Sequence, residues 1–134
     1  LQQQLPRLKN QAIVARIVAA HTAGVPPKDL FIAPAFAISQ LLERVRLNLD
    51  DIDWFEINEA FASQMVACCK KLNLDQERVN PLGGGVSLGH PIGASGARVV
   101  VTMLHAMAQR NLKRGIASLC LGGGNAVAML VERQ

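Results

Sequence analysis

The pattern of hydrophobic and polar positions changes its period along the chain, and each period predicts one kind of element. Residues 12–21, "AIVARIVAAH", form an apolar run rich in β-branched side chains, which is typical of a buried strand. Gly24 and two prolines close that run. The polar residues 1–10 are interpreted as the end of a helix. After the prolines, apolar residues recur at the i, i+3, i+4, i+7 spacing of an amphipathic helix, at Ile38, Leu41, Leu42 and Val45.

The middle of the chain repeats this order of strand and helix. Residues 52–58, "IDWFEIN", predict a short strand. Residues 59–72, "EAFASQMVACCKKL", predict a helix whose apolar face contains Ala62, Met65, Val66 and Cys69. Val79 and Asn80 predict a second short extended segment, which leads into a glycine-rich loop.

The last third predicts one more helix and a hairpin. Ser95 or Gly96 is expected to cap the helix. Its buried face is expected to contain Ala97, Val101, Leu104 and Ala108. Residues 114–132 predict two strands joined through glycines, with the hairpin at the edge of the sheet. The alternation of strands and helices predicts an α/β fold with a mixed, mainly parallel sheet and helices packed on both faces.

Composition and charge narrow the function classes. The 134 residues fit one domain, and with 50% hydrophobic and 18% charged residues the chain is not of the disordered class. The net charge of +4 is scattered and aromatics are few, so we expect no nucleic-acid partner. No apolar run reaches the roughly 18 residues of a membrane span, so no membrane association is expected. Three cysteines, two of them adjacent, favour a reducing, cytoplasmic setting and show no zinc-site spacing.

The glycine-rich loop, "GGGVSLGHPIGASGAR" at residues 83–98, matches neither phosphate-binding motif. No frame supplies G-x-G-x-x-G, and His90 and Pro91 stand where a P-loop needs Lys and Ser or Thr. A histidine in such a turn is more often structural than catalytic. However, Asn58 stands where a strand passes into a helix, and Cys120 leads into three glycines. Polar groups at strand ends form sites in α/β proteins, so two interpretations of Cys120 stay open: a nucleophile or base, and a buried strand cysteine.

Three segments in this order carry a resemblance to a known family. "NEAFA" at residues 58–62, the loop at residues 83–98 and "CLGGG" at residues 120–124 resemble the signature blocks of the thiolase family. The similarity extends over residues 12–132. It implies that residues 1–134 are a thiolase C-terminal domain, a thiolase-like half whose start and whole N-terminal partner half are absent. The implied reaction is acyl transfer between acyl-CoA and acetyl-CoA, by Claisen condensation or by thiolysis of 3-ketoacyl-CoA.

The resemblance also implies roles for individual residues. Cys120 resembles the acid/base cysteine, and His90 resembles the histidine that activates the nucleophile. Together with a water held by Asn58, His90 would bind the thioester oxygen. The backbone N–H of Gly122 would belong to a second oxyanion hole. Ala60 and Phe61 fall where the family lines its acyl and pantetheine tunnel, although core packing explains Phe61 equally well.

The nucleophilic cysteine of thiolases belongs to the absent N-terminal half. Cys68 and Cys69 lie in the middle of a predicted helix, so we interpret them as packing residues. The expected partners are an acyl-CoA substrate, the N-terminal half in cis or trans, and further copies in a homo-oligomer. No metal or bound cofactor is expected, because coenzyme A thioesters are substrates. The alternative is a catalytically inactive thiolase-like module that binds acyl-CoA or a partner protein.

Overall fold

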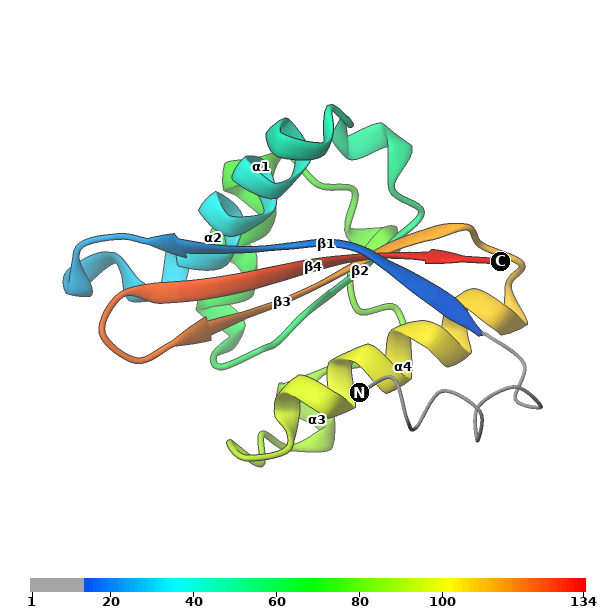
Figure 1. Ribbon diagram of the computed structural model, residues 1–134. Coiled ribbons are helices and arrows are strands. Elements are labelled where there is room, and N and C mark those ends of the chain that lie inside the picture. Colours follow the sequence, from blue (N-terminus) through cyan, green and yellow to red (C-terminus); the bar gives the residue numbers. More distant parts are fainter. Residues whose placement is uncertain (1–13) are drawn as a thin grey trace, which may run out of the picture.

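The computed structural model describes residues 14–134, which form a four-stranded sheet with helices on both faces (Figure 1). The strands are β1 (Ala15–Gly24), β2 (Trp54–Ile57), β3 (Arg114–Leu121) and β4 (Asn125–Arg133). The helices are α1 (Ala33–Val45), α2 (Ala62–Leu72), α3 (Gly85–Leu88) and α4 (Ser95–Gln109). Short 3₁₀ turns occur at Pro27–Ile32, Leu49–Asp51 and Gln76–Arg78. The helix end predicted over residues 1–10 and the first two residues of the predicted strand lie outside the described residues.

The strand order in the sheet is β1-β4-β3-β2. The α/β class, the mixed sheet and the helices on both faces are confirmed. The expected majority of parallel pairs is wrong, because β2–β3 is parallel whereas β1–β4 and β3–β4 are antiparallel. The reason is the position of the hairpin: β3 and β4 occupy the centre of the sheet rather than its edge, so β4 imposes the opposite direction on both neighbours.

The first strand differs from its prediction in burial. β1 lies at the edge of the sheet, where Ile17 is 63% exposed and Ala23 is buried. Its β-branched residues therefore reflect strand propensity rather than a position in the core.

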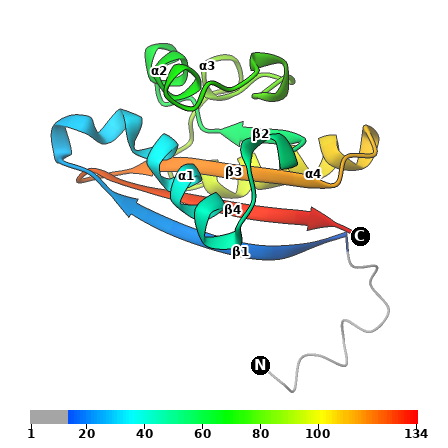
Figure 2. The same ribbon diagram turned by 90° about the horizontal axis from the view of Figure 1, so that it is seen from above.

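One face of the sheet carries α1 and α2, whose apolar sides form the larger core with Phe55 and Ile57 of β2. Ile38, Leu41 and Leu42 are buried as their spacing predicts. The prediction for α2 is confirmed in part. Met65 and Cys69 are buried, but Ala62 and Val66 are exposed, and Cys68 lies on the inner side instead. Seen from above, α1 lies over the strands, whereas α2 and α3 lie beyond β2 (Figure 2).

The other face of the sheet is covered by α4, which forms a second core. Its buried side chains Val99, Met103 and Met107 pack against Trp54 and Ala117. The face predicted from Ala97, Val101, Leu104 and Ala108 is wrong for three of its four residues. Ala97, Val101 and Ala108 are exposed, Val101 by 52%, whereas Leu104 is half-buried and packs against this second core. Both sides of α4 are apolar, so periodicity alone could not select the inner one. Within residues 14–134, no helix combines the length and the hydropathy needed to cross a membrane.

Candidate active site

The site begins at the carboxyl ends of two neighbouring parallel strands. Asn58 follows β2 directly, and its backbone N–H donates to the carbonyl of Ser118 at 2.9 Å, which continues the β2–β3 pairing. Cys120 lies two residues further along β3. The sheet therefore brings Asn58 and Cys120 to the same edge, as the strand-end positions predict.

His90 contacts Asn58 through one ring nitrogen and Ser95 through the other. Asn58 Nδ2 lies 3.2 Å from His90 Nε2, and His90 Nδ1 lies 2.5 Å from Ser95 Oγ. The Ser95 hydroxyl donates its one hydrogen to the carbonyl of Pro91 at 3.0 Å, so its oxygen accepts from Nδ1–H. In the neutral ring Nε2 then carries the lone pair, which matches an amide donor at Asn58. These contacts favour the tautomer in which Nε2 is the acceptor.

The Asn58 side chain has an unsatisfied acceptor. The residue is 1% exposed, and its Oδ1 has no hydrogen-bond partner among residues 14–134. A buried oxygen left in this state costs about 1–3 kcal/mol, so a donor from water, ligand or another segment would be favoured there. This acceptor belongs to the same amide that contacts His90.

Ser95 was expected as a helix cap, and this prediction is wrong. Ala94 is the N-cap residue of α4, and it makes no side-chain capping hydrogen bond. The Ser95 hydroxyl is used by Pro91 and His90 instead. Its spacing of five residues from His90 was visible in the sequence, but the spacing does not reveal which group the hydroxyl binds.

Glu59 holds the glycine-rich loop and was missed in the sequence. Its Oε2 accepts from the backbone N–H of Val86, and its Oε1 accepts from Asn80 Nδ2, both at 2.9 Å. A Cβ on Gly84 would lie 2.4 Å from the Glu59 carboxyl carbon. Glycine at this position lets the loop backbone sit directly on the carboxylate. The loop thus cradles a side chain of its own chain, and no phosphate is needed to explain this glycine.

Asn80, at the end of the predicted extended segment, serves as a substitute strand partner for β2. Its side-chain amide accepts from Ile57 N–H at 2.9 Å and donates to Ile57 carbonyl at 2.7 Å. Its backbone N–H donates to the carbonyl of Phe55, next to a parallel bridge between Phe55 and Val79. These bonds fix the strand end from which Asn58 projects.

Cys120 lies near the end of β3, ahead of the turn to β4. It is half-buried, and burial raises the pKa of its thiol, so the neutral form is favoured at physiological pH. Within the described part of the chain the thiol makes no hydrogen bond to Asn58 or His90. Asn58 and His90 are therefore in direct contact, whereas Cys120 belongs to the candidate site because β3 ends at the same edge of the sheet as β2.

The turn after Cys120 depends on one glycine more than on the others. Gly124 has φ +92°, and a Cβ there would lie 2.2 Å from the Val25 carbonyl oxygen. Gly122 is exposed, and a Cβ there would meet no atom within 4 Å. The described residues thus leave the space in front of Gly122 open.

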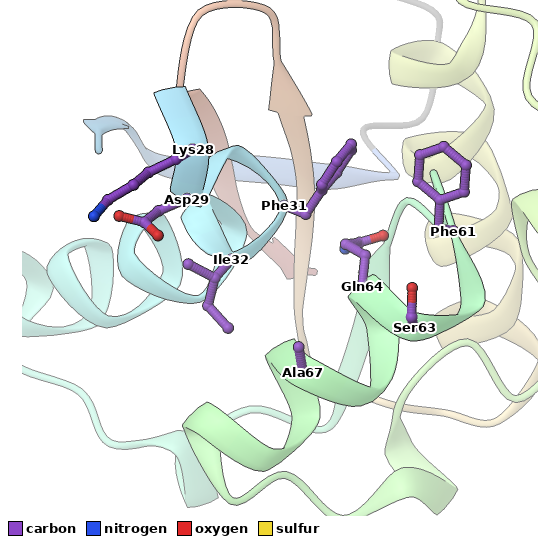
Figure 3. Close-up of a pocket in the computed structure, with 8 residues that line it drawn as sticks. All are labelled: Lys28, Asp29, Phe31, Ile32, Phe61, Ser63, Gln64 and Ala67. Atoms are coloured by element: carbon purple, nitrogen blue, oxygen red, sulfur yellow. The ribbon is translucent and has the colours of Figure 1, made fainter. Parts of the chain in front are cut away.

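Phe61 lines a pocket of about 350 Å³ on the α2 side of the sheet (Figure 3). The pocket is lined by Lys28, Asp29, Phe31, Ile32, Phe61, Ser63, Gln64 and Ala67. The Phe61 ring is 57% exposed, which contradicts core packing, and it meets the Phe31 ring edge-on with centroids 5.1 Å apart. Ala60 lies outside this lining, and its N–H donates to Gln64 Oε1 at 3.1 Å.

Cys68 and Cys69 are packing residues, as predicted. Both are buried within the α2 core, and burial raises the pKa of each thiol. Neither has the exposure that a thiolate nucleophile needs. Residues 14–134 also contain no group of three or more His, Cys, Asp or Glu side chains arranged to hold a metal ion.

Comparisons with known proteins place this arrangement in a family. Residues 11–133 match the family model described as the thiolase C-terminal domain. A probable acetyl-CoA acetyltransferase of Escherichia coli K12 is 47% identical over 95% of this chain and 32% of its own length. A second E. coli protein, an acetyl-CoA acetyltransferase, is 50% identical over 90% of this chain and 30% of its own length.

Solved structures agree with the sequence comparisons. The acetyl-CoA acetyltransferase of Bacillus anthracis superposes with a TM-score of 0.92 at 49% identity, over 98% of this chain and 34% of that one. A thiolase from Ascaris suum, solved with coenzyme A, gives a TM-score of 0.86 at 46% identity, over 98% and 33%. The chain thus spans about a third of the length of the proteins it resembles.

Proposed function

The chain belongs to the thiolase family, and we propose that it acts as the C-terminal catalytic domain of a thiolase that transfers acyl groups between coenzyme A thioesters. The observation that carries the proposal is the Asn58–His90 contact at the sheet edge that also holds Cys120. Relatives named as acetyl-CoA acetyltransferases support the substrate class.

His90 would serve first as a base and then as a donor. Its Nε2 lone pair can take the proton of a nucleophilic cysteine from the rest of the protein. Protonated Nε2 then faces the Asn58 Nδ2 donor, and two donors cannot share a hydrogen bond. Asn58 must release the ring, which frees Nε2–H for the oxygen of a thioester. The unpartnered Asn58 Oδ1 supports a bound water as the second donor to that oxygen.

Cys120 would move the proton at the α-carbon. In thiolysis the nucleophilic thiolate attacks the ketone carbon of a 3-ketoacyl-CoA, and the bond between the α-carbon and that carbon breaks. The departing acetyl-CoA carbanion takes the proton of the Cys120 thiol. Free CoA then gives its thiol proton to the Cys120 thiolate and attacks the acyl-enzyme thioester, so that acyl-CoA leaves and the nucleophilic thiolate is freed. A raised pKa keeps Cys120 protonated for this role. Condensation runs the same steps backwards.

The roles of Gly122, Ala60 and Phe61 belong to the same proposal. The open space at Gly122 is compatible with a backbone N–H that binds the oxygen of the acyl-enzyme. The exposed Phe61 ring and its pocket are compatible with contact to the acyl or pantetheine chain. Coenzyme A thioesters are substrates in this scheme, which needs no metal and no bound cofactor.

The remaining two thirds of a thiolase would supply the nucleophile and cover the outer side of α4. On that side Val14, Val101 and Ala108 are exposed, and together with the half-buried Leu104 and with His105 they line a mainly apolar hollow. An apolar surface of this kind favours a protein partner, which we propose is the N-terminal half in cis or trans. Homo-oligomers are proposed on the same ground. The cytoplasmic location stays a prediction, since relatives are named as cytosolic, peroxisomal and mitochondrial.

Thiolysis of acetoacetyl-CoA by free CoA tests the proposal. The chain alone is expected to be inactive, and the chain joined to its N-terminal half is expected to be active. In the complete protein Cys120→Ala should lower kcat by about 10²–10⁴-fold, the usual contribution of a general acid or base. Cys68→Ala is the matched control and should retain activity.

Two results would contradict parts of the proposal. Activity of the chain alone that disappears in Cys120→Ala would make this chain the source of the nucleophile. A folded complete protein that binds coenzyme A without turnover would support the inactive module instead.

A further inference from the structure

Glu56 is a carboxylate buried completely between β2 and α4. It is 0% exposed, its Oε1 accepts from Trp54 Nε1 at 3.0 Å, and its Oε2 accepts from Arg98 Nη1 at 3.3 Å. Burial raises the pKa of Glu56 to about 6, against the opposing effects of Trp54 and Arg98. At pH 7.5 the group is therefore ionised and paired with Arg98.

This ion pair lies beside both contacts of His90. Side chains two residues apart on a strand share one face, so Glu56 and Asn58 both point toward α4. Residues three apart on a helix lie one above the other, so Arg98 follows Ser95 on the same side of α4. The ion pair thus joins the two segments that end in the Asn58–His90 contact at 3.2 Å and the His90–Ser95 contact at 2.5 Å.

The rest of the interface between α4 and β2 is mainly apolar packing, with one cation–π contact at the far end of the helix, where the guanidinium of Arg110, the C-cap residue, lies 4.9 Å from the centroid of the Trp54 ring. Val99 and Met103 pack against Trp54 through dispersion, which permits small sliding movements. Among residues 14–134, the Arg98–Glu56 contact is the one side-chain hydrogen bond between these two elements. At the end of α4 nearest His90 it is therefore the contact that selects one position of the helix along the strand.

Stability does not explain the pair. Arg98 Nε and Nη2 are buried without a partner in the described part of the chain, so the guanidinium uses one donor where a fork could use two. Buried ion pairs commonly contribute less to stability than apolar residues of similar volume, and unpaired donors lower their contribution further. Setting a register is the better attested use of such groups.

We propose that Glu56 and Arg98 are positioning residues, whose contact fixes α4 along β2 and thereby the geometry in which His90 Nε2 meets Asn58. The geometric part stands on the structure alone, whereas its effect on turnover rests on the proposed function. A displacement of about 1 Å at a reacting group can lower a rate by about 100-fold. A shift of α4 along β2 should therefore lower kcat.

The first test needs no activity and uses nitrogen NMR of the His90 ring in the complete protein at pH 7.5. In wild type, the shifts should show a protonated Nδ1 and an unprotonated Nε2. In Glu56→Gln and in Arg98→Met, the two resonances should move toward each other as the ring loses its fixed partners. The double variant Glu56→Gln/Arg98→Met removes both charges and so leaves the net charge near His90 unchanged. A change in the His90 nitrogen resonances that persists in this variant therefore reports a change of position and not of the local electric field. Arg98→Lys keeps the charge and should restore part of the wild-type spectrum.

The second test measures kinetics in the complete protein. Glu56→Gln and Arg98→Met should each lower kcat by roughly 10- to 100-fold while KM changes less than about twofold. Glu132→Gln is the matched control, because Glu132 pairs with Arg16 and Arg114 in the same sheet, away from His90. It should leave both the His90 spectrum and kcat unchanged.

The outcomes separate the two proposals. Variants that lose unfolding free energy but keep the His90 spectrum and kcat would overturn the positioning role. Loss of activity in proportion to lost assembly with the N-terminal half, at an unchanged His90 spectrum, would also overturn it. An inactive wild-type protein would contradict the proposed function, and the NMR result would still decide the positioning role.

Discussion

The two sides of the candidate site are built by different means. The Asn58–His90 side, residues 58–61 and 80–95, is held by side-chain hydrogen bonds from Glu59, Asn80 and Ser95. The Cys120 turn, residues 120–125, is held mainly by the β3–β4 ladder and by Val25 N–H to the Gly124 carbonyl at 2.8 Å, with a single side-chain bond from Asn125 Nδ2 to the Gly122 carbonyl at 3.3 Å. Each side thus fixes its chemical group by a separate mechanism.

The difference follows from what each segment connects. A hairpin turn inherits its position from the register of its two strands, so small residues suffice. Within residues 14–134 the loop before α4 pairs with no strand, so its backbone N–H groups need other acceptors. The Val86 N–H donates to the Glu59 carboxylate, and the Ile57 N–H of β2 donates to the Asn80 side-chain amide. Where a loop at a site is not paired with a strand, polar side chains must therefore supply the hydrogen bonds that hold its backbone.

The largest expected effect separates two glycines of the Cys120 turn. Gly124→Ala places a Cβ 2.2 Å from Val25 carbonyl at a positive φ, so we expect a loss of about 3 kcal/mol or more in unfolding free energy. Gly122→Ala meets open space and should stay within about 0.5 kcal/mol of wild type. Urea unfolding at fixed protein concentration compares them. Equal losses would mean that the turn is not held by its backbone contact.

Much of the fold was predictable, because strand runs and helix spacing are local properties. The order of elements, the hairpin and the buried positions of α1 follow from short windows of sequence. The direction of most strand pairs and the inner side of α4 do not. They depend on where β4 inserts, between β1 and β3, and on which of two apolar faces the sheet covers. Contacts between residues far apart in the sequence therefore decide the direction of the strand pairs and the buried side of α4.

The candidate site was predictable only in its chemical groups. Asn58, His90 and Cys120 stand out because each is a polar or reactive residue at a strand end or in a glycine-rich turn. Glu56 and Arg98 do not stand out, since a single charge in a strand and one in a helix are ordinary in sequence. Their meaning appears only when β2 and α4 are packed together.

A smaller expected effect is the pH dependence of the unfolding free energy, to which the Asn58–His90 side contributes through Glu56. Glu56, on the Asn58–His90 side, has a folded pKa of about 6 against an ordinary 4.5, so the folded protein binds its proton more tightly. Its contribution to stability is complete below pH 4.5 and is lost as pH rises through 6, by up to about 2 kcal/mol. The facing groups are Arg98, Trp54 and Glu59.

Unfolding free energies of wild type and Glu56→Gln from pH 4.5 to 7.5 isolate this contribution. Other carboxyl groups are shared and cancel in the difference, so wild type should gain stability relative to the variant as pH falls. Parallel profiles would contradict a raised pKa for the buried carboxyl group.

The smallest expected effect concerns Ser95, whose hydroxyl contacts both the His90 ring and the Pro91 carbonyl. Ser95→Ala removes the acceptor of His90 Nδ1–H and a buried donor to Pro91, at a cost of about 1 kcal/mol in unfolding free energy. Without that acceptor the ring can place its proton on Nε2, so nitrogen NMR should show a mixture of tautomers. Ser87→Ala is the control in the same loop, since Ser87 is exposed and its hydroxyl donates to the Gly84 carbonyl and to no other group among the described residues. If the His90 spectrum is the same in both variants, the tautomer is set by Asn58 alone, and the Asn58–His90 side needs one fewer side chain than the structure indicates.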